Sequence, residues 1–310
     1  MGPARIYPWR KMHRSRAPSI APGTFFVAQP WADCITNMPG FNLRQAQASL
    51  FGQDMRVTSL VLRSLALWSL GFPEAALADA NLSLNEAREM GDAGSLLLSL
   101  FFGAVTHFLC GSYATTETLA NELYTLADEQ GAVLWKSSGQ QYRGWVLAVT
   151  GRASEATQLL AQSLAAFRST GSTGMTPFGL AWLGKSYAEL DQPDDALRSV
   201  NEAKDVIERT GERWAEVDVH RIAGEIALRS PQPDAAKAEA HFECALTVAR
   251  RQQAKSWELR AATSMARLWR DQGKPQQARE LLAPVYGWFT EGFETIDLKE
   301  AKTMLDELLV

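Results

Sequence analysis

The sequence predicts an all-α fold, a right-handed α-solenoid of about six helix-turn-helix repeats with a C-terminal capping helix. Two series of small residues, each with a period of about forty, carry this prediction. The first series is Ser64, Ala104, Gly144, Gly184, Gly224 and Ala266. The second series follows twelve residues later as Ala76, Thr116, Ala156, Ala196, Ala236 and Ala278. Two helices pack closely only where small side chains meet at their crossing, so each repeat needs one on both helices.

Turn-forming residues recur in the same register and mark where the helices should end. The turn inside each repeat falls at Gly71, Gly111, Gly151, Asp191, Pro231 and Gly273, and the repeats end at Gly91, Gly131, Gly171 and Gly211. We therefore expect helix breaks near 71, 91, 111, 131, 151, 171, 191, 211, 231, 253 and 273. Leu183, Gly184 and Tyr187, with Ala196 twelve residues beyond the glycine, complete a pattern typical of tetratricopeptide-like repeats.

In chain order, each repeat should supply an apolar first helix and an amphipathic second helix. The repeats begin near Gln53 and occupy 53–91, 92–131, 132–171, 176–211, 212–253 and 254–289. Pro73 suits the first turn of the second helix in the first repeat. A last helix should begin after Asp297, which we expect to be its N-cap. No stretch predicts a strand.

The first 50 residues differ from the remainder of the chain. They lack the forty-residue period, and prolines at 3, 8, 18, 22 and 30 would interrupt any helix there. We expect an N-terminal segment over 1–50 that is largely disordered or irregular, and a repeat domain over 51–310. Residues 1–40 hold five of the 31 basic residues and one of the 35 acidic residues, leaving 26 basic and 34 acidic residues, a charge of about −8, for the remainder.

Composition narrows the range of partners and compartments. The net charge of −4 argues against a general nucleic-acid partner, which requires a basic excess. No apolar run reaches the roughly 18 residues that a membrane helix needs. Cys34, Cys110 and Cys244 are odd in number and widely spaced, which fits a reducing compartment. We therefore expect a cytoplasmic protein that binds neither nucleic acid nor membrane.

One segment matches the pattern of a phosphate-binding loop. Residues 179–186 satisfy GxxxxGK[ST], with Lys185 and Ser186 in the places of the phosphate and metal ligands. Such a loop requires a preceding strand and a flexible turn, whereas these residues are bulky, apolar and flanked by predicted helix. Gly184 already belongs to the small-residue series, so we expect no nucleotide site here.

Two His-x-x-Cys pairs are candidate chemical sites, as are two carboxylate pairs, Glu212 with Glu216 and Asp194 with Asp195. His107 with Cys110 and His241 with Cys244 would together form a zinc set. The two pairs fall in the second and fifth repeats, and repeats of a solenoid contact only their neighbours, so we expect them to stay apart. No nucleophile and base occur in a catalytic arrangement. We therefore expect no enzymatic activity, no metal and no cofactor.

The C-terminal part of the chain resembles a known family. Residues 257–308, WELRAATSMARLWRDQGKPQQARELLAPVYGWFTEGFETIDLKEAKTMLDEL, are similar to the end of the tetratricopeptide-like region in large bacterial signalling proteins. Those proteins join a class III adenylate or guanylate cyclase domain, an ATPase domain and a helical-repeat tail, and the resemblance extends back to about residue 51. It implies a regulatory tail, detached or free-standing, whose partner is a cyclase or ATPase polypeptide. It transfers no catalytic residue.

Two functions from different classes follow from this fold. The first is a non-catalytic scaffold for protein–protein interaction, with a protein or peptide bound in the concave groove. The alternative is a sensor that holds a small-molecule effector inside the superhelix, as the repeat domains of some ATP-dependent transcription activators do. A deep apolar cavity would favour the sensor, and an open groove with paired charges would favour the scaffold.

Helical spacing predicts which side chains face the groove. In the first two repeats these are apolar: Val61, Leu65, Trp68, Phe101, Val105 and Phe108. In the last three repeats they are charged: Lys185, Glu189, Arg221, Glu225, Arg260, Arg267 and Arg270. The charged set should select an acidic peptide. The apolar set is either an exposed docking surface or ordinary core, and the sequence leaves both interpretations open.

Overall fold

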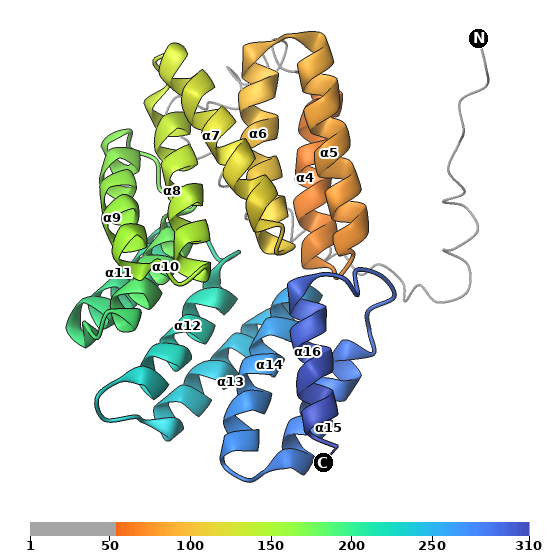
Figure 1. The fold of residues 1–310 in the computed structure, drawn as a ribbon, viewed down its shortest axis with the longest axis vertical. Helices are drawn as coiled ribbons and strands as arrows, with labels where there is room; N and C mark the ends of the chain where they lie inside the picture. The colour runs from red at the N-terminus through yellow and green to blue at the C-terminus, as the bar shows by residue number, and fades with distance from the viewer. Residues whose placement is uncertain (1–53, 310) are drawn as a thin grey trace.

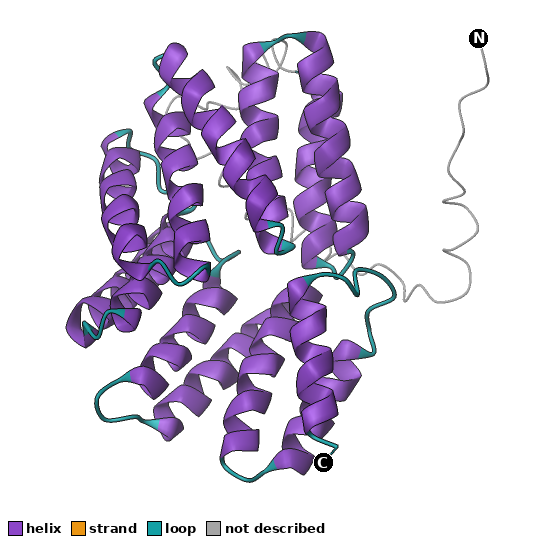
Figure 2. Cartoon of the chain, in the orientation of Figure 1, coloured by secondary structure: helices purple, strands orange, loops and turns teal. Residues whose placement is uncertain are grey.

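The structure is a computed structural model that describes residues 54–309, which form thirteen helices, labelled α4 to α16, without a strand (Figures 1 and 2). The first helices of the six repeats are α4 (Met55–Ser69), α6 (Ala93–Leu109), α8 (Val133–Val149), α10 (Thr176–Glu189), α12 (Glu216–Arg229) and α14 (Lys255–Asp271). The second helices are α5 (Pro73–Met90), α7 (Tyr113–Glu129), α9 (Ala153–Ser169), α11 (Pro193–Thr210), α13 (Ala235–Gln252) and α15 (Pro275–Tyr286), and α16 (Ile296–Glu307) caps the stack. The predicted α-solenoid is confirmed, and every expected break falls between two helices. The segment expected to be disordered or irregular, 1–50, lies outside the described residues.

The helix ends follow from local chemistry. Pro73 occupies the first turn of α5, as expected, because its missing N–H is not needed there. The Asp54 side chain caps α4 by accepting from the backbone N–H of Arg56 and Val57, at 2.6 and 3.1 Å. At the break near 253 the chain turns without a glycine, because Gln253 itself adopts the left-handed conformation with φ of 55°.

The small-residue series marks close helix crossings, as predicted. A Cβ atom on Gly184 would lie 3.0 Å from both the Ala196 carbonyl oxygen and a Val200 methyl group. A Cβ atom on Gly224 would lie 2.4 Å from the Phe242 ring. These contacts leave no room for a side chain. The forty-residue period therefore marks the points at which the two helices of each hairpin cross.

The concave side of the superhelix is filled in part by an aromatic cluster. Its members are Trp68, Phe101, Phe108, Tyr142, Trp145, Phe178, Trp182, Trp214 and Trp257, all buried. The rings touch one another through all six repeats, for example Phe108 on Trp145 at 5.5 Å and Phe178 on Trp214 at 5.1 Å between centroids. Edge-to-face and tilted arrangements of this kind are favourable for aromatic pairs. The inner surface of the superhelix is thus partly hydrophobic core.

The first and sixth repeats contact each other. This contact departs from the rule that the repeats of a solenoid contact only their neighbours. Trp68 of α4 and Trp257 of α14 stack edge to face at 4.8 Å, and the Ser256 hydroxyl donates to the Trp68 carbonyl oxygen. Gly292 N–H donates to Glu74 at 2.8 Å on the start of α5. Figure 1 shows the loop before α16 beside the ends of α4 and α5. We call this contact between α4–α5 and α14–α16 the seam.

The N-cap of the capping helix α16 lies two residues earlier than predicted. Thr295, not Asp297, is its N-cap residue, and the Thr295 hydroxyl donates to the Gly292 carbonyl oxygen at 2.6 Å. Asp297 lies in the first turn, where the helix dipole favours its charge, and it pairs with Arg260 of α14. The expected capping role was wrong because the tertiary partner of Asp297 lies in another repeat.

Candidate ligand pocket in the superhelix

A cavity of about 760 Å³ occupies the part of the concave side that the aromatic cluster does not fill. Residues of α8, α10, α12, α14 and α16 line it, together with the end of α6 and the starts of α7 and α9. Its charged lining residues are Arg152, Glu155, Lys185, Glu189, Arg221, Glu225, Arg229, Arg260, Arg267, Asp297 and Glu300. These are six basic and five acidic side chains, so the cavity is close to neutral although the repeat domain is acidic. We call it the charged pocket.

A buried ion network crosses the wall of the charged pocket. Asp218 is fully buried and accepts from Arg221 Nε at 2.7 Å. Arg221 also pairs with Glu225, whose second oxygen lies 3.1 Å from Lys185 Nζ. Lys185 and Glu225 occupy equivalent positions forty residues apart in adjacent repeats, so the lattice itself brings them together. The network joins α10 to α12.

The facing charges keep this network ionised. Burial opposes the charge of Glu225, but Arg221 and Lys185 outweigh it and lower the pKa of Glu225 to about 2. Burial likewise opposes the charge of Arg221, and Asp218 with Glu225 raises its pKa above the ordinary range. The wall of the pocket is therefore a fixed array of opposite charges at neutral pH.

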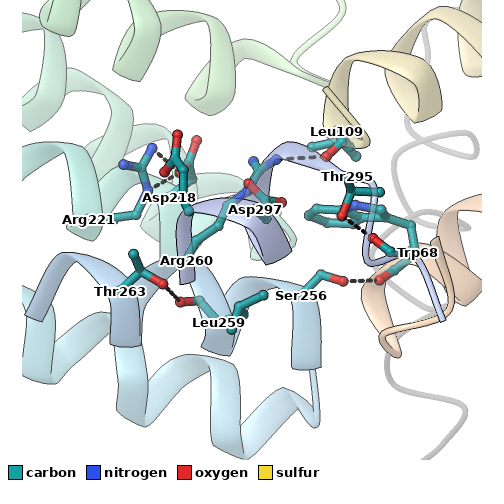
Figure 3. A network of polar contacts seen from close by, with 12 residues as sticks. Trp68, Leu109, Asp218, Arg221, Ser256, Leu259, Arg260, Thr263, Thr295 and Asp297 are labelled. Atoms are coloured by element: carbon teal, nitrogen blue, oxygen red, sulfur yellow. Dashed lines mark hydrogen bonds and ion pairs between the residues drawn. The ribbon is translucent and has the colours of Figure 1, made fainter. Parts of the chain in front are cut away.

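Arg260 connects the charged pocket to the seam, as Figure 3 shows. Its Nε donates to Asp297 at 2.9 Å, and its Nη2 donates to the Leu109 carbonyl oxygen at 2.7 Å. Its guanidinium lies 5.1 and 5.2 Å from the ring centroids of Trp68 and Trp257. One side chain thus holds α6, α16 and the two tryptophans of the seam together.

The mouth of the pocket carries charges that are less fully paired. Arg229 and Arg267 are exposed, and Arg267 reaches Glu300 only at 3.8 Å. Arg229 forms no ion pair with any residue that the structure describes. Deeper in, the indole N–H of Trp182 is buried without a hydrogen-bond partner among residues 54–309. The mouth therefore offers an incoming ligand two exposed cations, Arg229 and Arg267.

The structure brings together most of the charged residues predicted to face the groove. Six of the seven line the charged pocket: Lys185, Glu189, Arg221, Glu225, Arg260 and Arg267. The seventh, Arg270, lies outside it and pairs with Asp271 at 2.8 Å and with Glu307. Arg270 follows Arg267 by almost one helical turn at the end of α14, where the capping helix is its neighbour. The groove rule therefore fails only where the stack ends.

The six apolar residues predicted for the groove all lie in the hydrophobic core. Val61, Leu65, Trp68, Phe101, Val105 and Phe108 have exposed fractions between 0 and 3%. Phe101 packs on Trp135 and Tyr142, and Phe108 packs on Trp145 and Trp182. Of the two interpretations that the sequence left open, this burial fits ordinary core.

Several residues that line the charged pocket were not predicted from the sequence. Arg152 and Glu155 come from the start of α9, a second helix that no groove rule covers, and they pair with each other at 2.7 Å. Asp297 and Glu300 come from the capping helix, whose docking side cannot be read from the repeat period. An Arg-x-x-Glu spacing at a predicted helix start was the one available signal for the first pair.

The phosphate-loop pattern lies inside a helix. Residues 179–186 belong to α10, the Ser186 hydroxyl bonds to the Trp182 carbonyl oxygen at 2.9 Å, and Lys185 pairs with Glu225. A helix offers no cradle of free amide groups for a phosphate. Within the described part of the chain, no strand precedes this segment, so the pattern is a coincidence of the repeat.

The two His-x-x-Cys pairs remain on separate helices. His107 of α6 lies 3.0 Å from the Asn81 side chain, whereas the ring of His241 of α13 faces His220 at 5.9 Å between centroids. Over residues 54–309, no three His, Cys, Asp or Glu side chains are arranged to hold a metal ion. No helix of that region has the length and apolar character required to cross a membrane.

Comparison with known proteins supports the fold. No model of a known protein family matches the sequence, and no curated protein matches it. The apo form of RapI is similar in structure, with a TM-score of 0.56 and 12% identity over 92% of this chain and 99% of that one. A Rap protein complexed with competence and sporulation factor gives a TM-score of 0.56 and 12% identity over 92% of this chain and 85% of that one. The chain therefore shares a tetratricopeptide-like helical-repeat fold with these structures.

Proposed function

We propose that this protein is a non-catalytic helical-repeat scaffold that binds a protein or peptide in the charged pocket, and that an acidic segment of the partner enters it. The observation that carries the proposal is a cavity of about 760 Å³ in which eleven of the lining side chains are charged, most of them in ion pairs. Paired charges in an open groove favour a scaffold over a sensor for an apolar effector. The complex of the similar Rap protein with competence and sporulation factor supports a ligand-binding role for this fold.

The acidic character of the partner follows from the mouth of the pocket. Arg229 has no ion pair among the described residues and Arg267 has only a distant one, so both guanidinium groups are available to carboxylates. Guanidinium groups bind carboxylates in a planar, bidentate geometry. The inner acidic residues, such as Glu225, are already neutralised by Lys185 and Arg221. Glu189 of the lining, like Arg229, forms no ion pair among the described residues, so the preference for an acidic partner rests on the two exposed guanidinium groups at the mouth.

Fluorescence polarisation with labelled hexapeptide pools of acidic, neutral and basic composition tests this proposal. We expect the acidic pool to bind most tightly at low salt, and to lose affinity as salt rises because exposed charges are screened. The double variant Arg229→Glu with Arg267→Glu should weaken acidic peptides at least tenfold. Arg198→Glu, at an exposed position of α11 where the side chain pairs with Asp195, is the matched control. Preference for basic peptides, or equal binding by both variants, would contradict the proposal.

The cavity volume favours a second candidate, the effector sensor. About 760 Å³ lies within the range of small-molecule sites, and the seam closes one side of the superhelix. A thermal-shift screen with anionic metabolites separates the two candidates. A millimolar or tighter metabolite that raises the melting temperature of the wild type, but not of the Arg229→Glu with Arg267→Glu variant, would favour the sensor.

The partner that we propose is a signalling polypeptide of the cyclase and ATPase type, in the cytoplasm of a bacterium. This finer proposal rests on the resemblance of residues 257–308 to the tails of such proteins. Gene neighbourhood is its first test, because a cyclase–ATPase gene next to this one would place the two products together. Co-purification of that polypeptide with the wild-type chain, but not with the Arg229→Glu with Arg267→Glu variant, would link the partner to the charged pocket.

A further inference from the structure

Glu212 is a buried carboxyl group in the loop between α11 and α12, away from the charged pocket. Its exposed fraction is 7%. One oxygen, Oε1, accepts two hydrogen bonds, from the backbone N–H of Met175 at 2.9 Å and from Trp214 Nε1 at 2.7 Å. Met175 belongs to the loop between α9 and α10, so this single oxygen ties two interhelical loops together.

No cation neutralises Glu212. The charged groups nearest along the chain are paired with one another, since Arg213 bonds Glu208 and Glu216 at 3.0 and 2.7 Å. Arg251, from the neighbouring α13, is also bound to Glu216, at 3.4 Å. The α9–α10 loop contributes the uncharged Met175, and α10 contributes no charged side chain to this contact. Glu212 therefore forms no ion pair with any described residue.

Burial without a cation favours the neutral carboxyl group. The hydrogen bonds from Trp214 and Met175 favour the ionised group, but burial outweighs them and raises the pKa of Glu212 to about 7. Since an ordinary glutamate has a pKa near 4.5, Glu212 exchanges its proton in a range where other carboxyl groups stay ionised.

The two residues that donate hydrogen bonds to Glu212 both lie at constrained positions. Met175 is buried and has φ of 65°, a left-handed conformation that costs free energy for a residue with a side chain. It is the N-cap residue of α10, the helix that carries Trp182 and Lys185 to the pocket. Trp214 packs on Phe178 at 5.1 Å, inside the aromatic cluster. The hydrogen bonds of Glu212 thus fix the start of α10 against the next repeat.

We propose that Glu212 is a proton-controlled lock between the α9–α10 loop and the α11–α12 loop. The neutral carboxyl group keeps the loops closed, because it satisfies both donors without a buried charge. Ionisation places an unpaired charge inside the protein, and opening of the loops relieves it by admitting water. Opening releases Met175 from its left-handed conformation and frees the start of α10.

The sign of the pH dependence follows from proton linkage. Because the folded state holds its proton more tightly than the unfolded or opened state, the stabilisation is complete below the unfolded pKa near 4.5. It is lost as pH rises through the folded pKa of about 7. The opened population of the two loops should therefore increase by about tenfold per pH unit between about 4.5 and 7, for one linked proton, and level off above pH 7.

Amide hydrogen exchange between pH 5.5 and 8.5, corrected for the intrinsic pH dependence of exchange, tests the lock on the full chain. We expect the opening of residues 172–179 and 212–216 to increase about tenfold per pH unit from pH 5.5 to about 7 in the wild type, and to level off between pH 7 and 8.5. Glu212→Gln keeps an acceptor and has no titration, so its opening should not change with pH. Glu208→Gln, at an exposed neighbour, should behave as the wild type.

Two results would overturn the lock. One is an equal pH dependence in the wild type and Glu212→Gln. The other is greater opening of these loops at acid pH in the wild type, which would show that the ionised form holds them closed. If Glu212→Gln does not fold, the wild type alone tests the proposal. Residues 119–127 of α7, which do not include Glu212 or its two donors, then serve as an internal reference. Opening that increases from pH 5.5 to about 7 and is confined to the two loops supports the proposal, and parallel opening of α7 contradicts it.

Discussion

The first helices of repeats one and two and those of repeats four to six occupy equivalent places in the lattice but have different roles. Trp68 and Phe101 are almost fully buried in the aromatic cluster, whereas Lys185 and Arg267 line an open cavity. The repeat period directs all four side chains toward the concave side. What covers them decides whether they become core or a binding surface, and that depends on the curvature of the whole superhelix.

The seam explains the difference. It brings α14 and the loop before α16 against α4 and α5, while the rings of Trp145 and Trp182 fill the space inside α6. The concave side next to α10 and α12 has no such cover, and their charged side chains leave a cavity. Four substitutions, from the largest expected effect to the smallest, test this contrast.

Phe108→Ala should have the largest effect. Removing a ring that is 2% exposed and touches Trp145, Phe178 and Trp182 should lower the free energy of unfolding by about 3–5 kcal/mol. The melting temperature should fall by roughly 6–20 °C, measured by circular dichroism. Phe293→Ala, at a ring that is 45% exposed, is the matched control and should change little. Unchanged melting with improved solubility would return Phe108 to the docking-surface interpretation.

Arg260→Ala should have the next largest effect, because it opens the seam. The substitution leaves Asp297 without its partner and the Leu109 carbonyl without a donor, at a cost of about 3 kcal/mol in urea unfolding. Arg260→Lys should recover little, since a single ammonium group does not reproduce the forked geometry. Arg267→Ala, which removes an exposed arginine of the same helix, is the comparison. Equal losses from Arg260→Ala and Arg267→Ala would show that the seam contributes no stability.

Gly184→Val should cost about 1–3 kcal/mol through packing. Its side chain would meet the Ala196 carbonyl oxygen and Val200 at the closest point of the α10–α11 crossing. Ala161→Val, on the exposed side of α9, measures the cost of valine in a helix without a crossing. Chemical denaturation of both variants gives the difference. If the two costs agree, the forty-residue series does not reflect close packing.

Lys185→Ala should have the smallest effect on stability, less than about 1 kcal/mol, because the ion pair with Glu225 is partly exposed to solvent. Isothermal calorimetry should detect no ATP binding to the wild type or the variant, since the phosphate-loop pattern lies inside α10. ATP binding by the wild type that disappears in Lys185→Ala would contradict this interpretation. Lys237→Ala, on α13, is a control for general loss of a basic charge.

The sequence predicted the repeat architecture well because the lattice is a local property. Glycines such as Gly91 end helices by adopting positive φ, and small residues such as Gly224 permit close crossings, so both leave a periodic signal. Of the seven charged residues that helical spacing predicted to face the groove, six line the charged pocket. These features depend on helix geometry and on contacts between adjacent helices, which a forty-residue window contains.

The tertiary structure determined the contacts between residues that lie far apart in the sequence. The partner of Arg260 is 37 residues away in Asp297, and its second acceptor, the Leu109 carbonyl oxygen, is 151 residues away. Small rotations between successive repeats accumulate into the curvature that closes the seam, and no single repeat encodes their sum. The sequence by itself therefore determined the helices, their crossings and the direction of their side chains. Only the tertiary structure decided which of those side chains are core, which line a pocket and where Glu212 is buried without a cation, because each outcome depends on what the completed superhelix places opposite them.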